Sequence, residues 1–162
     1  QRHHYRLAGG LIADPGDQIK NGQVLIDIVH PLVNMQGVDF RPKNDDNDSG
    51  IVLHLSYGQN TFLFTADVSS AVEADLIDEK INLSSDVLKI GHHGSRYSSS
   101  EEFLRAVHPR LAVISVGGHN TYGHPTQVVL QRLKNLGIST LRTDQSGTIE
   151  ILSDGQNIKV IK

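Results

Sequence analysis

The alternation of hydrophobic and polar positions divides the chain into short elements. Apolar runs bounded by glycine, proline or polar clusters predict β-strands at residues 23–31, 51–58, 61–67, 86–90, 111–118, 139–144, 147–154 and 157–162. The runs 86–90 and 111–118 are apolar almost throughout, which is typical of strands buried on both faces. Gly58, Gln59 and Asn60 separate two of the runs and indicate a hairpin.

Helical patterns lie between these strands. Ser70 with Glu73, and Ser99 with Glu102, have the spacing of a capping box, in which a serine side chain binds the first amides of a helix. We therefore expect Ser70 and Ser99 to begin helices, the second of which stops before Pro109.

A third helix is predicted after residue 124. Pro125 suits its first position, the apolar residues of 129–136 give it one hydrophobic face, and Gly137 supplies a left-handed cap. Strands alternating with helices predict an α/β fold, in which helices pack on a sheet.

Composition narrows the classes of function. The 162 residues fit one domain, and a net charge of −3 gives no basic field for a polyanion. The absence of cysteine excludes disulfides, thiolate nucleophiles and cysteine zinc sites. No apolar stretch approaches the length of a membrane span. The opening QRHHYRLAGG resembles the interior of a longer sequence, so we expect the chain to be part of a larger protein.

Polar residues follow three of the predicted strands at their carboxyl ends. Asp67 comes after the first, His92 and His93 after the second, and the segment 119–124 after the third. The carboxyl ends of strands in α/β sheets form ligand-binding crevices. Carboxylate and imidazole groups suit zinc, manganese or iron, and catalytic sites leave one coordination position open. The pattern therefore indicates a divalent metal site.

Other roles compete with coordination for these residues. Asp67 precedes a helix and suits its N-terminal amides equally well. His124 precedes a proline, where a capping role is the alternative. Glycines flank the histidine pair and let its backbone approach a ligand, so we expect one imidazole to face the metal and the other to point elsewhere or support it. The histidines expected to be structural are His30, His54 and His108.

Three segments together resemble one family. They are NDSGIVLHLSYGQNTFLFTADVSSAVEADL, SDVLKIGHHGSRYSSSEEFL and PRLAVISVGGHNTYGHPTQVVL, followed by RTDQSGTI. They are similar to the metallo-β-lactamase-like domain of the ComEC competence proteins over roughly residues 22–153. The resemblance implies an α/β fold that is the C-terminal part of a metallo-β-lactamase-like αββα sandwich, a mixed sheet with helices on a face. It implies a single domain, 1–162, that lacks the family's first-half H-x-H-x-D-H segment.

The resemblance also implies a function. The expected activity is that of a metal-dependent hydrolase, a nuclease or phosphodiesterase of a bacterial competence protein that takes up DNA for transformation, acting on the strand that is not imported. The implied cofactor is zinc or manganese, with an incomplete site in this chain. The implied partners are DNA and the remaining parts of the parent protein, and we expect a homodimer through an uncovered apolar face. As a domain of a membrane protein, it would lie on the extracytoplasmic face of the bacterial cytoplasmic membrane.

Site residues follow from the same match. The family's metal-bridging aspartate matches Asp67, and its late histidine ligand matches the pair His92 and His93, of which we favour His92. The catalytic residues would be Asp67, His92 and His124, and the metal ligands Asp67, His92 and His93. The residues expected to bind substrate are Ser95, Arg96, Asn120, Tyr122 and His124. The loop that contains Ser95 is either a phosphate cradle at a helix N-terminus or an ordinary helix cap.

Two departures from the family pattern lie close together in the motifs. Asn47 and Asp48 match the family's ND, but Gly50 replaces the serine that follows, and Ala66 replaces the glycine of TGD. Ala66 would be strained if its backbone requires a positive φ.

The missing first-half ligands leave two alternative functions open. The first is a non-catalytic DNA-binding or assembly module, which strong salt dependence of DNA binding without a metal requirement would favour. The second is a hydrolase for small esters, which would act on such esters and not on DNA.

Overall fold

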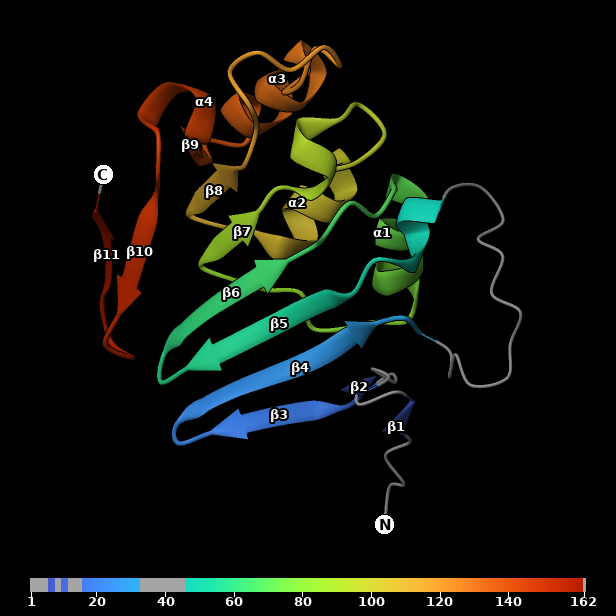
Figure 1. Ribbon diagram of the computed structural model, residues 1–162, viewed down its shortest axis with the longest axis vertical. Coiled ribbons are helices and arrows are strands. Elements are labelled where there is room, and N and C mark those ends of the chain that lie inside the picture. Colours follow the sequence, from blue (N-terminus) through green and yellow to red (C-terminus); the bar gives the residue numbers. More distant parts are fainter. Residues whose placement is uncertain (1–5, 8–9, 12–15, 33–45, 162) are drawn as a thin grey trace.

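A seven-stranded mixed sheet forms the centre of the molecule (Figure 1). The computed structural model describes residues 6–7, 10–11, 16–32 and 46–161. The strands are, in the order in which they pair, β3 (Gln18–Asn21), β4 (Val24–His30), β5 (Val52–Tyr57), β6 (Asn60–Phe64), β7 (Val87–Lys89), β8 (Leu111–Ile114) and β9 (Ser139–Arg142). The strands β3 to β6 pair antiparallel, and β6 to β9 pair parallel.

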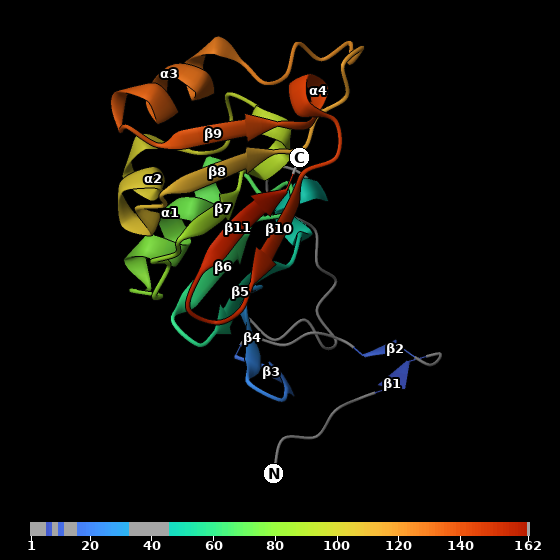
Figure 2. The ribbon, with the colours of Figure 1, turned by 90° about the vertical axis from the view of Figure 1, so that its left-hand side faces the viewer.

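Helices cover one face of this sheet. The helices α1 (Ser70–Asp78), α2 (Glu101–Val107) and α3 (Gln127–Asn135) lie on the same side in both ribbon views (Figures 1 and 2). The remaining elements are the pair β1 (Arg6–Leu7) and β2 (Gly10–Leu11), the short helices η1 (Asp46–Ser49), η2 (Gly91–Gly94) and α4 (Thr143–Ser146), and the hairpin of β10 (Glu150–Ser153) and β11 (Ile158–Ile161). The mixed α/β fold is the one that the sequence predicts. The expected single domain extends over segments that lie outside the described residues.

The hydrophobic core lies between the sheet and the three helices. The strands contribute Val52, Leu63, Leu88, Ala112 and Ile114, and the helices Val72, Leu76, Phe103, Leu104, Val107, Val129 and Leu133. Side chains alternate between the two faces of a strand, so each strand directs every second residue at the helices. Burying one such side chain stabilises the fold by about 1.5–3 kcal/mol.

The sheet has a second face, which points away from these helices. Residues adjacent to the core positions form it: Ile26, Ile28, Leu53, Leu55, Phe62, Phe64, Val87, Lys89, Val113 and Leu141. This second face is mostly apolar: Lys89 is its one charged residue, Asn21, Asn60 and Ser139 also lie on it by register, and Phe64 in it is 38% exposed. A sheet with two largely apolar faces is typical of a sandwich, in which a second sheet covers one of them.

The first two helices begin differently from the capping boxes expected. The N-cap of α1 is Ser69, whose hydroxyl accepts a bond from the Ala71 amide at 3.3 Å. The N-cap of α2 is Ser100, whose hydroxyl accepts from the Phe103 amide at 3.3 Å. The prediction of Ser70 and Ser99 as caps is therefore wrong by one residue in each helix.

The reason for both errors is the side chain of Glu73. It does not turn back to its own helix, as a capping box requires, but crosses to α2. One carboxylate oxygen accepts from the Ser99 amide, and the other accepts from the Ser100 amide at 2.9 Å. Glu73 is 1% exposed, and its burial raises the pKa of the carboxyl group.

The third helix also starts later than expected. Its N-cap is Thr126, so Pro125 precedes the helix and does not occupy its first position. The Thr126 hydroxyl donates to the Gly94 carbonyl at 3.0 Å, which draws it away from the helix amides. The predicted C-terminal cap is confirmed: Gly137 has φ 69°, and the Ile138 amide donates to the Leu133 carbonyl.

Several strands are shorter than their apolar runs. β6 ends at Phe64 and β8 at Ile114, because the chain then turns into the loops of the carboxyl edge. The strand β3 was not predicted, since all four of its side chains are exposed and it shows no alternation.

Candidate metal site

The carboxyl ends of three parallel strands meet at one edge of the sheet. Leu63 of β6 pairs with Leu88 of β7, which pairs with Ala112 of β8. The loops that follow these strands therefore emerge side by side, as the sequence predicted. They carry Asp67, the pair His92 and His93, and the segment 119–124.

The histidine loop has an unusual backbone. His92, His93 and Gly94 all have positive φ, at 48°, 54° and 84°. Each non-glycine residue in this region costs roughly 1–2 kcal/mol, and such strain is concentrated at functional sites. The loop is held in place by the His92 amide, which donates to the Ala66 carbonyl at 3.1 Å.

Gly94 lets this loop pack closely against the loop after β8. A Cβ at Gly94 would lie 2.6 Å from the Cβ of Pro125, so only glycine permits this approach. The Thr126 amide donates to the Gly94 carbonyl at 2.9 Å. The contact brings His124, the neighbour of Pro125, next to the histidine pair.

Asp67 and His93 face each other. The Nε2 atom of His93 lies 3.4 Å from a carboxylate oxygen of Asp67. On the opposite side of the ring, Nδ1 lies 2.6 Å from the Ser115 carbonyl oxygen, which can only accept, so Nδ1 carries a proton and donates. In a neutral ring Nε2 then directs a lone pair at the carboxylate. Two acceptors in this position require a cation between them, either a proton or a metal ion.

The chemistry of these two donors fits a divalent metal ion. Zinc binds imidazole nitrogen and carboxylate oxygen at about 2.0–2.2 Å, so two ligands of a tetrahedral site lie about 3.4 Å apart. The distance between His93 and Asp67 matches this separation. A backbone carbonyl that fixes the ring from behind, as Ser115 does, is the usual support of a metal-binding histidine. The geometry therefore favours His93 over His92 as the ligand.

His92 points to a different partner. Its ring packs edge-on against the ring of His124, with centroids 5.9 Å apart. His124 in turn stacks on Tyr122, with centroids 6.0 Å apart. Of the predicted residues, the structure thus brings Asp67, His92, His93 and His124 into one cluster, with Tyr122 at its exposed side.

The surroundings of His124 lower its pKa. Burial lowers the pKa of His124, the nearby imidazoles of His92 and His93 lower it further, and Asp67 acts in the opposite direction. At neutral pH the imidazole of His124 is therefore uncharged and able to accept a proton. Its Nδ1 atom is buried without a hydrogen-bond partner among the described residues.

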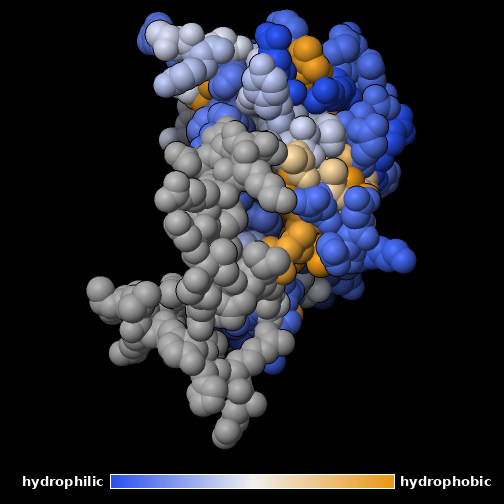
Figure 3. Space-filling model, turned by 90° about the vertical axis from the view of Figure 1, so that its right-hand side faces the viewer, coloured by the Kyte–Doolittle hydropathy of each residue, from blue (hydrophilic) through white to orange (hydrophobic). Residues whose placement is uncertain are grey.

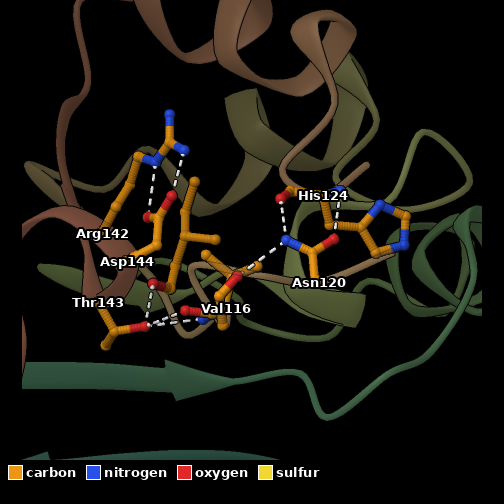
Figure 4. A network of polar contacts seen from close by, with 8 residues as sticks. Val116, Asn120, His124, Arg142, Thr143 and Asp144 are labelled. Carbon is orange, nitrogen blue, oxygen red and sulfur yellow. Dashed lines mark hydrogen bonds and ion pairs between the residues drawn. The ribbon is translucent and has the colours of Figure 1, made fainter. Parts of the chain in front are cut away.

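Asn120 shapes the loop, and both donors of its side chain are already bonded. Its amide nitrogen donates to the carbonyls of Gly117 (2.9 Å) and His124 (2.8 Å), and its oxygen accepts from the His124 amide at 2.9 Å (Figure 4). These bonds use both donors of the side chain. Asn120 therefore positions His124.

The serine loop lies against α2 and α3. Ser95 is buried and accepts from the Tyr97 amide, whereas Arg96 is exposed. The amides of Ser99 and Ser100, which a phosphate cradle would need, are bound to Glu73. Arg96 is thus the only one of these groups placed to meet a ligand.

A hollow of about 410 Å³ opens beside His93. It is lined by His93, Ser115, Val116, Gly117, Thr143, Gly147 and Thr148. The Thr143 hydroxyl accepts from the Val116 amide and donates to the Val116 carbonyl, both at 2.8 Å, which ties the end of β9 to the loop after β8 (Figure 4). Next to it, Arg142 binds Asp144 through two bonds and lowers the pKa of that carboxyl group.

Three residues at this edge of the sheet were not identified from the sequence: Ser115, Thr143 and Lys89. Ser115 acts through its backbone carbonyl, and Thr143 is remote in sequence, so no local pattern identifies either. Lys89 did carry a signal, since it is a charge within the apolar run DVLKI.

Within residues 6–7, 10–11, 16–32 and 46–161, no group of three or more His, Asp or Glu side chains is arranged to hold a metal ion. The pair of Asp67 and His93 is therefore a candidate for part of a metal site, and the described residues do not complete it. Across the same residues, no helix is both long and apolar enough to cross a bilayer.

Comparison with known proteins identifies the superfamily of the chain. Residues 8–119 match the model of the metallo-beta-lactamase superfamily. The chain belongs to this superfamily. It is 38% identical over 136 residues to "ComE operon protein 3" of Bacillus subtilis (strain 168), which covers 83% of the chain and 17% of that protein. It is 46% identical over 122 residues to "Competence protein ComA" of Neisseria gonorrhoeae, covering 70% of the chain and 18% of that protein.

A third relative is "Recombination protein 2" of Haemophilus influenzae (strain ATCC 51907 / DSM 11121 / KW20 / Rd), with 34% identity over 106 residues. These cover 65% of the chain and 13% of the relative. The chain thus spans less than a fifth of each relative's length. The resemblance to competence proteins inferred from the motifs is confirmed.

Proposed function

We propose that this chain is the hydrolytic domain of a competence protein and that it cleaves DNA phosphodiesters with a divalent metal ion. The observation that carries the proposal is the pair of Asp67 and His93, whose acceptor atoms face each other at 3.4 Å. The names of the relatives, a ComE operon protein, a competence protein and a recombination protein, supply the biological setting.

The roles of the residues follow from their contacts. Asp67 and His93 would hold zinc or manganese, and the Ser115 carbonyl keeps the proton of His93 on Nδ1. When bound, such an ion polarises phosphoryl oxygens and lowers the pKa of water. His124 stays uncharged and can accept a proton, and Asn120 fixes its position. His92 packs edge-on against the ring of His124, and Tyr122 stacks on it.

The site needs further ligands from elsewhere in the larger protein, because two donors do not fill the coordination of zinc or manganese. We infer that the domain works beside the remaining parts of that protein, on the extracytoplasmic face of the bacterial cytoplasmic membrane, and degrades the strand that is not imported.

The test is cleavage of labelled single- and double-stranded DNA by the larger protein that contains this chain, with added zinc or manganese. We expect metal-dependent shortening that Asp67→Ala reduces at least a hundredfold, because the carboxylate ligand is lost. Asp75→Ala is the matched control, since it removes an exposed carboxylate of α1 and leaves the site intact. Cleavage that survives a chelator or Asp67→Ala would overturn the proposal.

A second candidate is a DNA-binding or assembly module without catalysis. It is favoured by the absence of a three-residue metal group in the described part of the chain. It predicts DNA binding that weakens steeply with salt and that neither a chelator nor Asp67→Ala changes.

A further inference from the structure

Lys89 is the one charged residue on the second face of the sheet. Its neighbours in register are Phe64 of β6 and Val113 of β8, both apolar. A lysine half-buried between such side chains loses hydration, and burial lowers the pKa of its ammonium group. A hydrophobic residue would stabilise this position more, so the charge calls for a functional reason.

The ammonium group of Lys89 lies at the same edge as the metal-site residues. Lys89 pairs in register with Phe64, three residues before Asp67, and the attraction of Asp67 partly offsets the effect of burial on the pKa of Lys89. Lys89 and Asp67 form no direct ion pair within the described part of the chain. The ammonium donates to the Ile90 carbonyl at 3.2 Å, and this is its one hydrogen bond to the described residues. An ammonium group has three donors, so two remain for a ligand.

The register puts Lys89 at the carboxyl edge of the sheet. Lys89 is the last residue of β7 and pairs with Phe64, the last residue of β6, which lies three residues before Asp67. The loop with His92 and His93 begins two residues after Lys89. Lys89 therefore lies at the edge that carries the metal-site residues, outside the hollow beside His93.

We propose that Lys89 is a substrate-binding residue that donates to an anionic oxygen of a phosphodiester held beside Asp67 and His93 at the carboxyl edge of the sheet. The inference rests on the proposed function, because it needs a nucleic acid at this edge. A compact ammonium suits a single phosphate oxygen as a point charge. The chain's net charge of −3 gives the substrate no general attraction, which makes one well-placed cation more important.

Lys89→Met tests the role, because methionine retains the length of the stem and fits the apolar neighbours. The probe is a fluorescent single-stranded oligonucleotide with a hydrolysis-resistant phosphorothioate backbone, and the readout is its anisotropy with manganese present at several salt concentrations. We expect affinity to fall roughly tenfold, as for the loss of one charge-assisted hydrogen bond. The slope of log K against log salt should fall by about 0.7, the value for one phosphate contact on a single strand.

Two companion variants separate this role from a structural one. Lys134→Met removes an exposed cation of α3, on the opposite side of the sheet, and should leave affinity and slope unchanged. Lys89→Arg retains the charge and should restore the slope. The melting temperature of Lys89→Met should equal or exceed that of the wild type, because the cost of desolvating the ammonium disappears.

The outcomes distinguish the inference from the function on which it rests. If Lys89→Met binds the oligonucleotide with the affinity and the salt slope of the wild type, the role of Lys89 is overturned and the proposed function still stands. Equal losses in Lys89→Met and Lys134→Met overturn it as well, since they indicate only nonspecific charge. A wild-type protein that neither binds nor cleaves DNA overturns both.

Discussion

At the scale of single residues, the two departures from the family pattern touch each other. Ala66 has φ 44°, the conformation that the family's glycine would adopt without strain. A Cβ at Gly50 would lie 2.9 Å from the Cβ of Ala66 and 3.0 Å from the Asn47 carbonyl. In this chain residue 66 has a side chain, the methyl group of alanine, and residue 50 is glycine. In the family pattern residue 66 is glycine and residue 50 is serine. Neither replacement is independent of the other.

A double-mutant cycle tests this coupling. Ala66→Gly should stabilise the fold by about 1 kcal/mol, because it relieves the positive φ. Gly50→Ser alone should destabilise it by roughly 1–3 kcal/mol through overpacking. In the double variant most of that cost should vanish, because the Ala66 methyl group is gone. Urea denaturation measures all three free energies of unfolding, and additive effects would contradict the coupling.

At the scale of elements, the side chain of Glu73 joins α1 to α2, because its carboxylate accepts bonds from the amides of Ser99 and Ser100. Glu73→Ala would leave the amides of Ser99 and Ser100 unpaired and open a cavity, so we expect a loss of about 3 kcal/mol in the free energy of unfolding. Glu101→Ala is the control, because that side chain is exposed and its pair with Arg105 contributes less than about 1 kcal/mol. Equal losses in the two variants by urea denaturation would contradict this role.

Stability should also depend on pH through Glu73. Burial raises its folded-state pKa above the unfolded value of 4.5, so the folded protein holds this proton to higher pH. The contribution is fully present below 4.5 and is lost as the pH rises through the folded pKa. The stability of the wild type relative to Glu73→Gln should therefore fall from acid to neutral pH. A difference that stays constant or rises would show that the carboxylate form is preferred.

The elements also show what sequence patterns can predict. The strands with apolar runs, such as β7 and β8, and the glycine cap at Gly137 follow from local rules, and the sequence predicted them. Glu73 has the spacing of a local cap, but its partner is 26 residues away, so the local rule failed there. The same holds at the site, where motifs identified the histidine pair. The choice of His93 depends on the Ser115 carbonyl, which no local pattern reveals.

At the scale of the molecule, the second face of the sheet predicts association. Phe64 is 38% exposed there, and so is Ile19, the partner of Ile26 in register, at 54%; Ile51, just before β5, is 44% exposed. Figure 3 views a different side of the molecule, the one at which α1 lies in Figure 1, and hydrophobic residues are grouped there among hydrophilic ones. Surfaces of this kind pack against a partner, which we propose is either another part of the parent protein or a second copy of the chain.

Sedimentation of the isolated chain at increasing concentration tests that proposal. We expect a dimer whose dissociation constant rises at least tenfold in Phe64→Ser, because an apolar contact is replaced by a hydroxyl. Val128→Ser is the control, since this exposed residue of α3 lies on the helical side. A monomer at every concentration would contradict association of two copies.

The central claim is that Asp67 and His93 form part of a divalent metal site. The most direct measurement is the broadening of histidine ring signals in the NMR spectrum by substoichiometric Mn²⁺, which detects weak binding and locates it. We predict that the signals of His92, His93 and His124 broaden first, those of His54 and His108 remain sharp, and Asp67→Ala abolishes the selectivity. Equal broadening of the signals of these five histidines, or a pattern unchanged in Asp67→Ala, would contradict the claim.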